Sequence, residues 1–173
     1  MGPMRRLILF RHAKAEPRAA GEDDFDRPLA PRGREDAALV GRALATQNLA
    51  PDCALISPAR RTAETWIWAR DAFPRIRAEL NRALYDASVD DLRAAIDQVA
   101  DRCDTLIVVG HNPGLHELAV ELLIDAGASA AEVERVAARF PTATAAVYQI
   151  DPVGRAALED VLLARDLGGE GDG

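Results

Sequence analysis

Residues 106–113 read Leu-Ile-Val-Val-Gly-His-Asn-Pro: four apolar side chains followed directly by a glycine and a histidine. A short, uninterrupted apolar run is typical of a strand buried on both faces of a parallel sheet. Pro113 suits the first turn of a helix, which the following residues predict over 114–125. This stretch therefore predicts a strand, a turn that carries His111, and a helix, in that order.

The same order recurs along the chain. Residues 7–10 read Leu-Ile-Leu-Phe and precede Arg11 and His12, and the shorter run at 54–56 ends at Ser57 before a second helix. Strands that alternate with helices predict an α/β fold, a three-layer α/β/α sandwich with a mostly parallel central sheet. The other predicted elements are helices over 34–46, 60–72, 88–99 (capped by Ser88) and 130–139, a weak strand over 75–80, and closing strands over 145–150 and 157–164.

The composition predicts one globular domain over residues 1–173, with a frayed tail from 168. The chain is 49% hydrophobic and carries 28 acidic against 21 basic residues, a net charge of −7. A negative protein is a poor partner for nucleic acid or for an anionic membrane, so we expect neither. The polar loop over 13–33 is too long for an ordinary connection, which favours a functional role within the domain.

The cysteines and the N-terminus indicate the expected compartment. Cys53 and Cys103 lie 50 residues apart without CxxC spacing, and we expect two buried, reduced thiols. The apolar run at 7–10 is too short for a signal peptide or a membrane span. We therefore expect a cytoplasmic protein, and the lack of heptads favours a monomer.

Basic and imidazole side chains follow three predicted strands. Arg11 and His12 follow the first, Arg60 and Arg61 the second, and His111 the third. Ligands of open α/β sheets bind outside the carboxyl ends of the strands, so these groups are expected to meet. Guanidinium groups bind phosphate oxygens bidentately, and a neutral imidazole is a nucleophile toward phosphorus. The pattern predicts a phosphoryl site, with either Arg60 or Arg61 as a ligand.

These motifs resemble the histidine phosphatase superfamily, also called the phosphoglycerate mutase-like superfamily. More narrowly, the chain looks like the small bacterial phosphohistidine phosphatases. The match runs in order from residue 7 to about 150, so it covers most of the chain. The matching motifs are Leu9-Phe10-Arg11-His12-Ala13-Lys14-Ala15, Asp26-Arg27-Pro28-Leu29 with Gly33, Ser57-Pro58-x-x-Arg61-x-x-x-Thr65, Leu84-Tyr85-Asp86-Ala87-Ser88, Gly110-His111-Asn112-Pro113 and Phe140-Pro141-Thr142.

The resemblance implies a phosphatase of phosphoglycerate mutase-like fold, with no cofactor and no metal. It implies that His12 is the nucleophile that becomes phosphorylated, and that Arg11, Arg61 and His111 hold the phosphoryl oxygens. The family spacing from Ser57 selects Arg61 over Arg60. The implied partner is phosphohistidine on a protein, or a small phosphorylated molecule, with inorganic phosphate as product.

Two positions depart from the broad family pattern. Ala13 stands where the family usually has glycine, and no acid occupies a recognisable motif. A phosphoramidate needs an acid less than an ester does, because imidazole leaves easily, and this favours phosphohistidine as substrate. The candidates for an acid are Asp86, Glu79 and the loop residues Asp23, Asp24 and Asp26; those for further substrate contacts are Lys14, Arg27 and Asn112.

Three other functions fit parts of the pattern. A broad phosphomonoesterase acting on small metabolites would need one of the carboxylates above as its acid. A non-catalytic adaptor would bind phosphate or phosphopeptide without turnover. A metal protein is disfavoured, because His111 and His116 are five residues apart and a helical zinc pair is spaced i, i+4.

Overall fold

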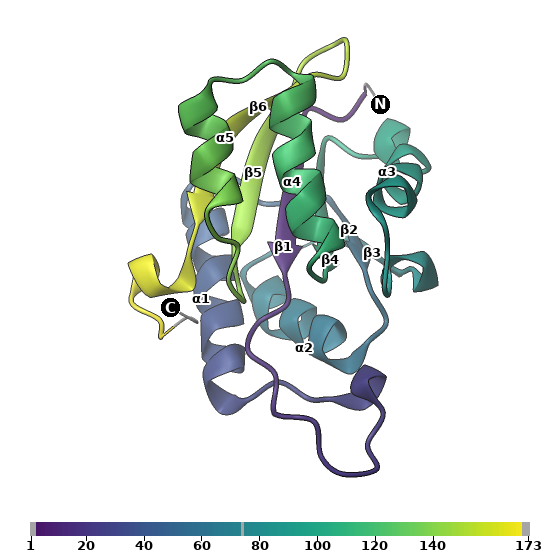
Figure 1. Ribbon diagram of the computed structural model, residues 1–173, viewed down its shortest axis with the longest axis vertical. Coiled ribbons are helices and arrows are strands. Elements are labelled where there is room, and N and C mark those ends of the chain that lie inside the picture. The colour runs from purple at the N-terminus through teal and green to yellow at the C-terminus, as the bar shows by residue number, and fades with distance from the viewer. Residues whose placement is uncertain (1–2, 74, 171–173) are drawn as a thin grey trace.

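The computed structural model describes residues 3–73 and 75–170. Within these residues, six strands form one sheet in the order β3-β2-β4-β1-β5-β6 (Figure 1). The first four strands are parallel, β5 is antiparallel to β1, and β6 is antiparallel to β5. The strands are β1 (Arg6–Arg11), β2 (Cys53–Ile56), β3 (Arg77–Leu80), β4 (Thr105–Gly110), β5 (Ala145–Ile150) and β6 (Ala156–Leu162). The helices are α1 (Pro31–Thr46), α2 (Arg60–Ala69), α3 (Val89–Asp97), α4 (Gly114–Asp125) and α5 (Ala130–Ala137).

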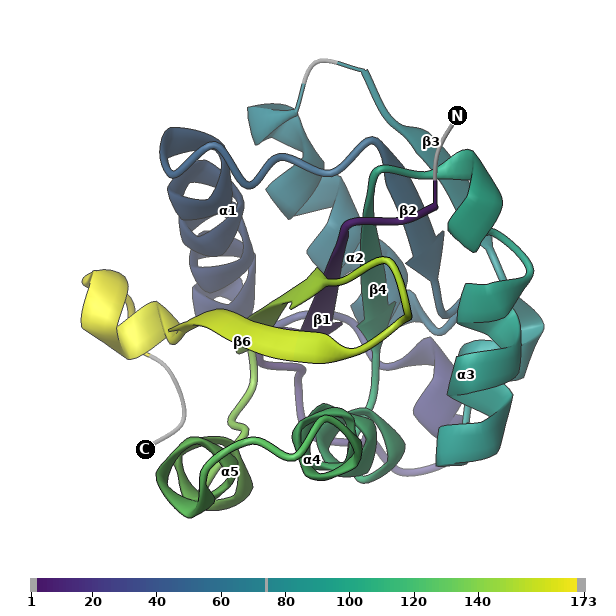
Figure 2. The same cartoon turned by 90° about the horizontal axis from the view of Figure 1, so that it is seen from above.

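Helices cover both faces of the sheet, which confirms the predicted three-layer architecture. Figure 2 shows α1 and α2 on one side and α4 and α5 on the other. Alternate residues of the central strands point to opposite faces of the sheet and contribute to two separate apolar cores. Leu106 and Val108 pack with α3, α4 and α5, whereas Ile107 and Val109 pack with α1 and α2. All four are fully buried, which explains why the run is apolar without alternation.

Most element boundaries fall close to the predicted ones, because local signals set them. Ser88 caps α3 in a reciprocal capping box with Asp91, and α4 spans the predicted residues. The α2 segment is shorter than predicted, since a 3-10 turn over Arg70–Ala72 replaces its last turn. The tail expected to fray is tied down in part: the Glu170 N–H donates to Asp36 on α1, and residues 171–173 lie outside the described chain.

The long loop after β1 folds back on itself rather than extending away. Ala15 pairs with Leu29 in an isolated bridge, and the Leu29 N–H donates to Glu64 on α2 at 2.8 Å. Gly33 is required where the loop enters α1, because a Cβ there would lie 2.1 Å from the Lys14 carbonyl oxygen. A 3-10 turn over Asp24–Asp26 lies against Arg61 on α2. The loop therefore contacts α2 at two places, through Leu29 and through Asp24.

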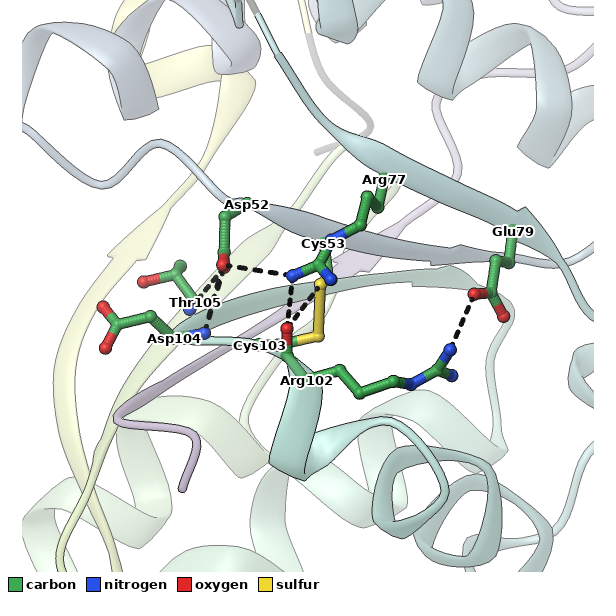
Figure 3. The surroundings of a disulfide bond; sticks show 8 residues. All are labelled: Asp52, Cys53, Arg77, Glu79, Arg102, Cys103, Asp104 and Thr105. Atoms are coloured by element: carbon green, nitrogen blue, oxygen red, sulfur yellow. Dashed lines mark hydrogen bonds and ion pairs between the residues drawn. A yellow bond between two sulfur atoms is a disulfide. The ribbon is translucent and has the colours of Figure 1, made fainter. Parts of the chain in front are cut away.

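Cys53 and Cys103 form a disulfide, so the prediction of two reduced thiols is wrong (Figure 3). Cys53 begins β2, and Cys103 lies just before β4, the strand that pairs with β2. Their Cα atoms are 5.7 Å apart, in the range a disulfide requires. Their spacing in the chain is uninformative, because a helical crossover separates the two cysteines and only strand pairing brings them together.

Glu79, one of the acid candidates, lies beside this disulfide. Its carboxylate pairs with the Arg102 guanidinium at 3.3 Å, and Arg77 donates to the Arg102 carbonyl oxygen (Figure 3). Asp52 accepts the backbone N–H groups of Asp104 and Thr105, which fixes the start of β4. Glu79 is therefore directed toward the disulfide and away from the residues predicted to bind phosphate.

We expect the disulfide to stabilise the fold by about 4 kcal/mol, because it closes a loop of 50 residues. The measurement is urea unfolding of the wild type with and without reductant. Cys53→Ala/Cys103→Ala is the control, and its free energy of unfolding should not respond to reductant. A wild-type difference below about 1 kcal/mol, well under the usual range for a disulfide, would contradict the expectation.

Candidate active site

Three strand ends converge at one edge of the sheet. Arg11 of β1 lies opposite Gly110 of β4, so His12 and His111 leave neighbouring strands at the same level. The His12 N–H donates to the Gly110 carbonyl oxygen at 3.1 Å, and the Ser57 N–H donates to that of Val109 at 3.0 Å. The two imidazole rings lie 5.4 Å apart, centroid to centroid. The predicted convergence of the two histidines is confirmed.

The His12 ring is held in one tautomer. Its Nδ1 lies 2.8 Å from the carbonyl oxygen of Ala13. A carbonyl oxygen only accepts hydrogen bonds, so Nδ1 carries the proton and Nε2 carries the lone pair. The side chain is 8% exposed, and burial, aided by the nearby positive charges of Arg61 and Arg11, lowers the pKa of His12 to about 3. At neutral pH His12 is therefore a neutral imidazole whose Nε2 carries a lone pair.

Thr65 joins the end of β1 to α2. Its hydroxyl accepts the Ala13 N–H at 2.9 Å and donates to the Arg61 carbonyl oxygen at 2.7 Å. The residue is fully buried, so both hydrogen bonds are protected from water. Through these two hydrogen bonds Thr65 ties the start of α2 to the residue that follows His12.

His111 is oriented by Ser57. Its Nε2 lies 2.7 Å from the Ser57 hydroxyl, which is itself fully buried. Burial lowers the pKa of His111 to about 3, and the Arg61 charge acts in the same direction. The other ring nitrogen, Nδ1, is buried and has no hydrogen-bond partner among the described residues. His111 is therefore a neutral imidazole with one nitrogen left for a ligand.

Arg11 and Asn112 share one acceptor. The Arg11 guanidinium and the Asn112 amide donate to the carbonyl oxygen of Phe140, at 2.9 and 3.0 Å. This carbonyl group belongs to the predicted Phe140-Pro141-Thr142 motif, just before β5. The hydrogen bond fixes the Arg11 side chain at the end of β1. Asn112 holds the segment around Phe140 through the same carbonyl oxygen.

Arg61 rather than Arg60 faces the histidines. Arg61 is 6% exposed, and its charge acts on the pKa of both histidines. Arg60 extends into solvent and pairs with Glu64 at 2.8 Å. The two arginines are adjacent on a helix, so they point in different directions by about 100°. Burial therefore places Arg61, and not Arg60, beside the histidines.

Asp24, in the 3-10 turn of the long loop, lies against Arg61. Its backbone oxygen and its carboxylate accept two guanidinium N–H groups, at 2.8 and 3.0 Å. Arg27 pairs with the same carboxylate at 2.9 Å, and the Tyr85 hydroxyl donates to it at 3.2 Å. Burial would raise the pKa of Asp24, but the Arg61 and Arg27 charges outweigh it and lower that pKa, so the carboxylate is ionised at neutral pH.

The remaining predicted residues lie around this centre. Asp86 is exposed, with a left-handed backbone (φ 55°), next to Tyr85. The Asp23 carboxylate caps the 3-10 turn by accepting the Phe25 N–H, and Asp26 is exposed. The Lys14 side chain is half-buried at the end of β1. Tyr85 has no role predicted from the sequence, yet its ring meets the His111 ring edge-on, with 5.5 Å between centroids.

The structure also bears on metal binding and on membrane insertion. Within 3–73 and 75–170, no three His, Cys, Asp or Glu side chains are grouped closely enough to hold a metal ion. Across that part of the chain, no helix combines the length and the apolar character needed to cross a bilayer.

The two neutral histidines make stability depend on pH. Each has a folded pKa near 3 against about 6.5 when unfolded, so the unfolded state binds more protons between these values. We expect the free energy of unfolding to fall as pH drops from 6.5 toward 3, by about 1.4 kcal/mol per pH unit for each histidine. The free energy of unfolding, measured with urea at pH 7 and at pH 5.5, should change less between these pH values in the double variant His12→Gln/His111→Gln than in the wild type. Parallel profiles would contradict this.

Comparison with known proteins identifies the family of this chain. The model of the histidine phosphatase superfamily (branch 1) matches residues 7–105. The uncharacterized protein Rv1276c of Mycobacterium tuberculosis is 39% identical over 141 residues, 82% of this chain and 87% of the relative.

Solved structures of phosphatases share the fold of this chain. A crystal structure of SixA from Agrobacterium tumefaciens, described as a candidate phosphohistidine phosphatase, is 28% identical, with a TM-score of 0.81 over 92% of this chain and 97% of that one. The protein histidine phosphatase SixA complexed with tungstate shares the fold, with 22% identity and a TM-score of 0.78 over 94% and 99% of the two chains. The chain belongs to the histidine phosphatase superfamily and is a phosphatase with a SixA-like fold.

Proposed function

We propose that this chain removes phosphoryl groups from phosphohistidine on proteins, through a phosphohistidine intermediate on His12 and without a metal ion. The observation that carries the proposal is the hydrogen bond from His12 Nδ1 to the Ala13 carbonyl oxygen, which leaves Nε2 as a free nucleophile. Arg11, Arg61 and His111 lie around it as donors for the phosphoryl oxygens, whose charge is spread in the transition state.

The reaction takes two displacements. His12 Nε2 attacks phosphorus and the new N–P bond forms, while the bond from phosphorus to the leaving imidazole breaks and that imidazole takes a proton from solvent water. Water then attacks the phosphorus on His12, the N–P bond breaks, and inorganic phosphate is released with His12 neutral again. Both steps pass through similar transition states, so one set of donors serves both.

The ionisation of Asp24 favours a phosphoramidate over an ester. An alkoxide leaving group needs a proton from a general acid, whereas imidazole has a pKa near ~6.5 and leaves easily. The Asp24 carboxylate, in contact with Arg61, is held ionised by Arg61 and Arg27 and so has no proton to donate. Asp86, another of the candidate acids, is exposed next to Tyr85 in the chain, and its role as an acid stays a prediction.

The test is paired hydrolysis, with chelator present, of a phosphohistidine peptide and an alkyl phosphate ester, whose alkoxide leaving group needs a general acid. We expect the phosphohistidine peptide to be hydrolysed much faster. Faster hydrolysis of the ester would instead indicate a phosphomonoesterase of small metabolites, with Asp86 as the candidate general acid. Binding of the phosphopeptide without turnover of either substrate would indicate an adaptor.

A further inference from the structure

The guanidinium of Arg61 is held by a single residue of the long loop. One N–H donates to the backbone oxygen of Asp24, and a second donates to its carboxylate. Two hydrogen bonds from one planar group to one residue fix both its position and its rotation. The Arg61 Nε is buried and has no hydrogen-bond partner within the described chain. Arg61 therefore keeps an N–H donor that its two hydrogen bonds to Asp24 do not use.

Asp24 is itself braced from two sides. Arg27 pairs with one carboxylate oxygen, and the Tyr85 hydroxyl donates to the other. The Tyr85 ring packs edge-on against both Phe25 and His111, with centroids 5.1 and 5.5 Å away. The carboxylate that orients Arg61 is therefore connected by direct contacts to His111, another residue proposed to hold the phosphoryl group.

Burial separates this arrangement from a surface ion pair. The Arg61 side chain is 7% exposed and that of Asp24 is 40% exposed, so the carboxylate lies on the outer side of a buried cation. A buried guanidinium without a partner is costly, and removing the partner leaves it free to reorient. Because the charges of Arg61, Arg27 and Arg11 all act on His111, the Asp24 carboxylate between Arg61 and Arg27 also limits their mutual repulsion.

We propose that Asp24 is a positioning residue, which holds the Arg61 guanidinium so that its remaining N–H groups face the phosphoryl group on His12. This rests on the proposed function for the identity of the anion. The loop over 13–33 thereby gains a definite role, because it supplies the carboxylate that sets the geometry of an arginine from α2. The role requires the negative charge and the length of aspartate, and no proton transfer.

The first measurement compares Asp24→Asn with the wild type in kcat, KM and the Kd of inorganic phosphate. A misplaced donor costs about 10- to 100-fold in rate, and we expect a loss of kcat in that range for phosphohistidine and ester alike. Phosphate binding should weaken in parallel. Asp26→Asn removes the same charge from an exposed position of the same turn and should behave like the wild type.

The decisive measurement is a double-mutant cycle with Arg61→Ala. If Asp24 acts through Arg61, Asp24→Asn should lower kcat/KM by less than about twofold further in the Arg61→Ala background. Additive losses would overturn the proposal. So would a loss confined to esters, which would indicate a general acid, or tighter phosphate binding, which would indicate that the carboxylate competes with the anion.

Two controls keep these outcomes separate. Phosphate binding needs no turnover, so the cycle can be completed on Kd even if no phosphohistidine is hydrolysed; the proposed function would then fail while the role of Asp24 was still tested. Asp24→Asn keeps the shape of the side chain, and near-ultraviolet circular dichroism reports whether it folds. Asp24→Glu restores charge with a longer stem and should recover only part of the rate.

Discussion

Replacing His12 with alanine is expected to lower kcat by at least about 10⁴-fold, because loss of a covalent nucleophile costs far more than loss of a binding group. The physical reason is that the His111 ring does not occupy the position of the lost ring: its Nε2 is held by Ser57, and its centroid lies 5.4 Å from that of His12. The measurement is single-turnover hydrolysis of a phosphohistidine peptide by purified wild type and variant.

A trapping experiment identifies the intermediate directly. Rapid quenching of the wild type under alkaline conditions, which preserve phosphohistidine, should yield protein that is phosphorylated on His12, and His12→Ala should yield none. A His12→Ala variant that retained about a tenth of the wild-type rate would exclude His12 as the nucleophile. Phosphate found on His111 instead would reassign the two roles.

Arg61→Ala is expected to lower kcat by about 10²–10³-fold, the usual effect of removing one donor from a transition state with developing negative charge. Arg60→Ala is the matched control, since it deletes the same side chain one position earlier on the same helix. Arg60 is exposed and pairs with Glu64 in the next turn, so its loss should cost about 0.3–0.5 kcal/mol of stability and leave kcat unchanged.

The comparison is informative because the two changes alter net charge equally. A long-range electrostatic effect would lower both rates, whereas a directed contact affects only Arg61. Equal losses in the two variants would contradict the assignment of Arg61 as a phosphoryl ligand. Steady-state kinetics with both substrates, together with urea unfolding of each variant, separates catalysis from folding.

The sheet was predictable because its signals are local. The apolar runs at 7–10 and 106–109 predict buried strands, and the residues directly after a parallel strand must appear at its carboxyl end. His12 and His111 are therefore expected at one edge, and the structure places their ring centroids 5.4 Å apart. A local capping signal likewise predicts the start of α3 at Ser88.

The disulfide between Cys53 and Cys103 is a feature that local sequence signals do not predict. Cys53 and Cys103 each precede an apolar run, and nothing near either of them indicates a bond. Their pairing follows from the position of β2 beside β4, which depends on how the intervening crossover packs against the sheet. The sequence contains both residues, but only the strand order brings them within reach.

The aspartates of the loop over 13–33 are a second feature whose roles local sequence signals do not predict. Asp23, Asp24 and Asp26 are equivalent as charges in the sequence, and nothing among them distinguishes one from the others. The fold makes them different: Asp24 meets Arg61, Asp23 caps a turn, and Asp26 is exposed.

By itself, then, the sequence determined the strands, the layered architecture and the set of residues that leave the strand ends, since each depends on neighbours in the chain. The tertiary structure alone decided the disulfide, the burial that separates Arg61 from Arg60, and the contact between Asp24 and Arg61. Each of these depends on the distance between segments that are far apart in sequence, and that distance is set by the packing of the whole domain.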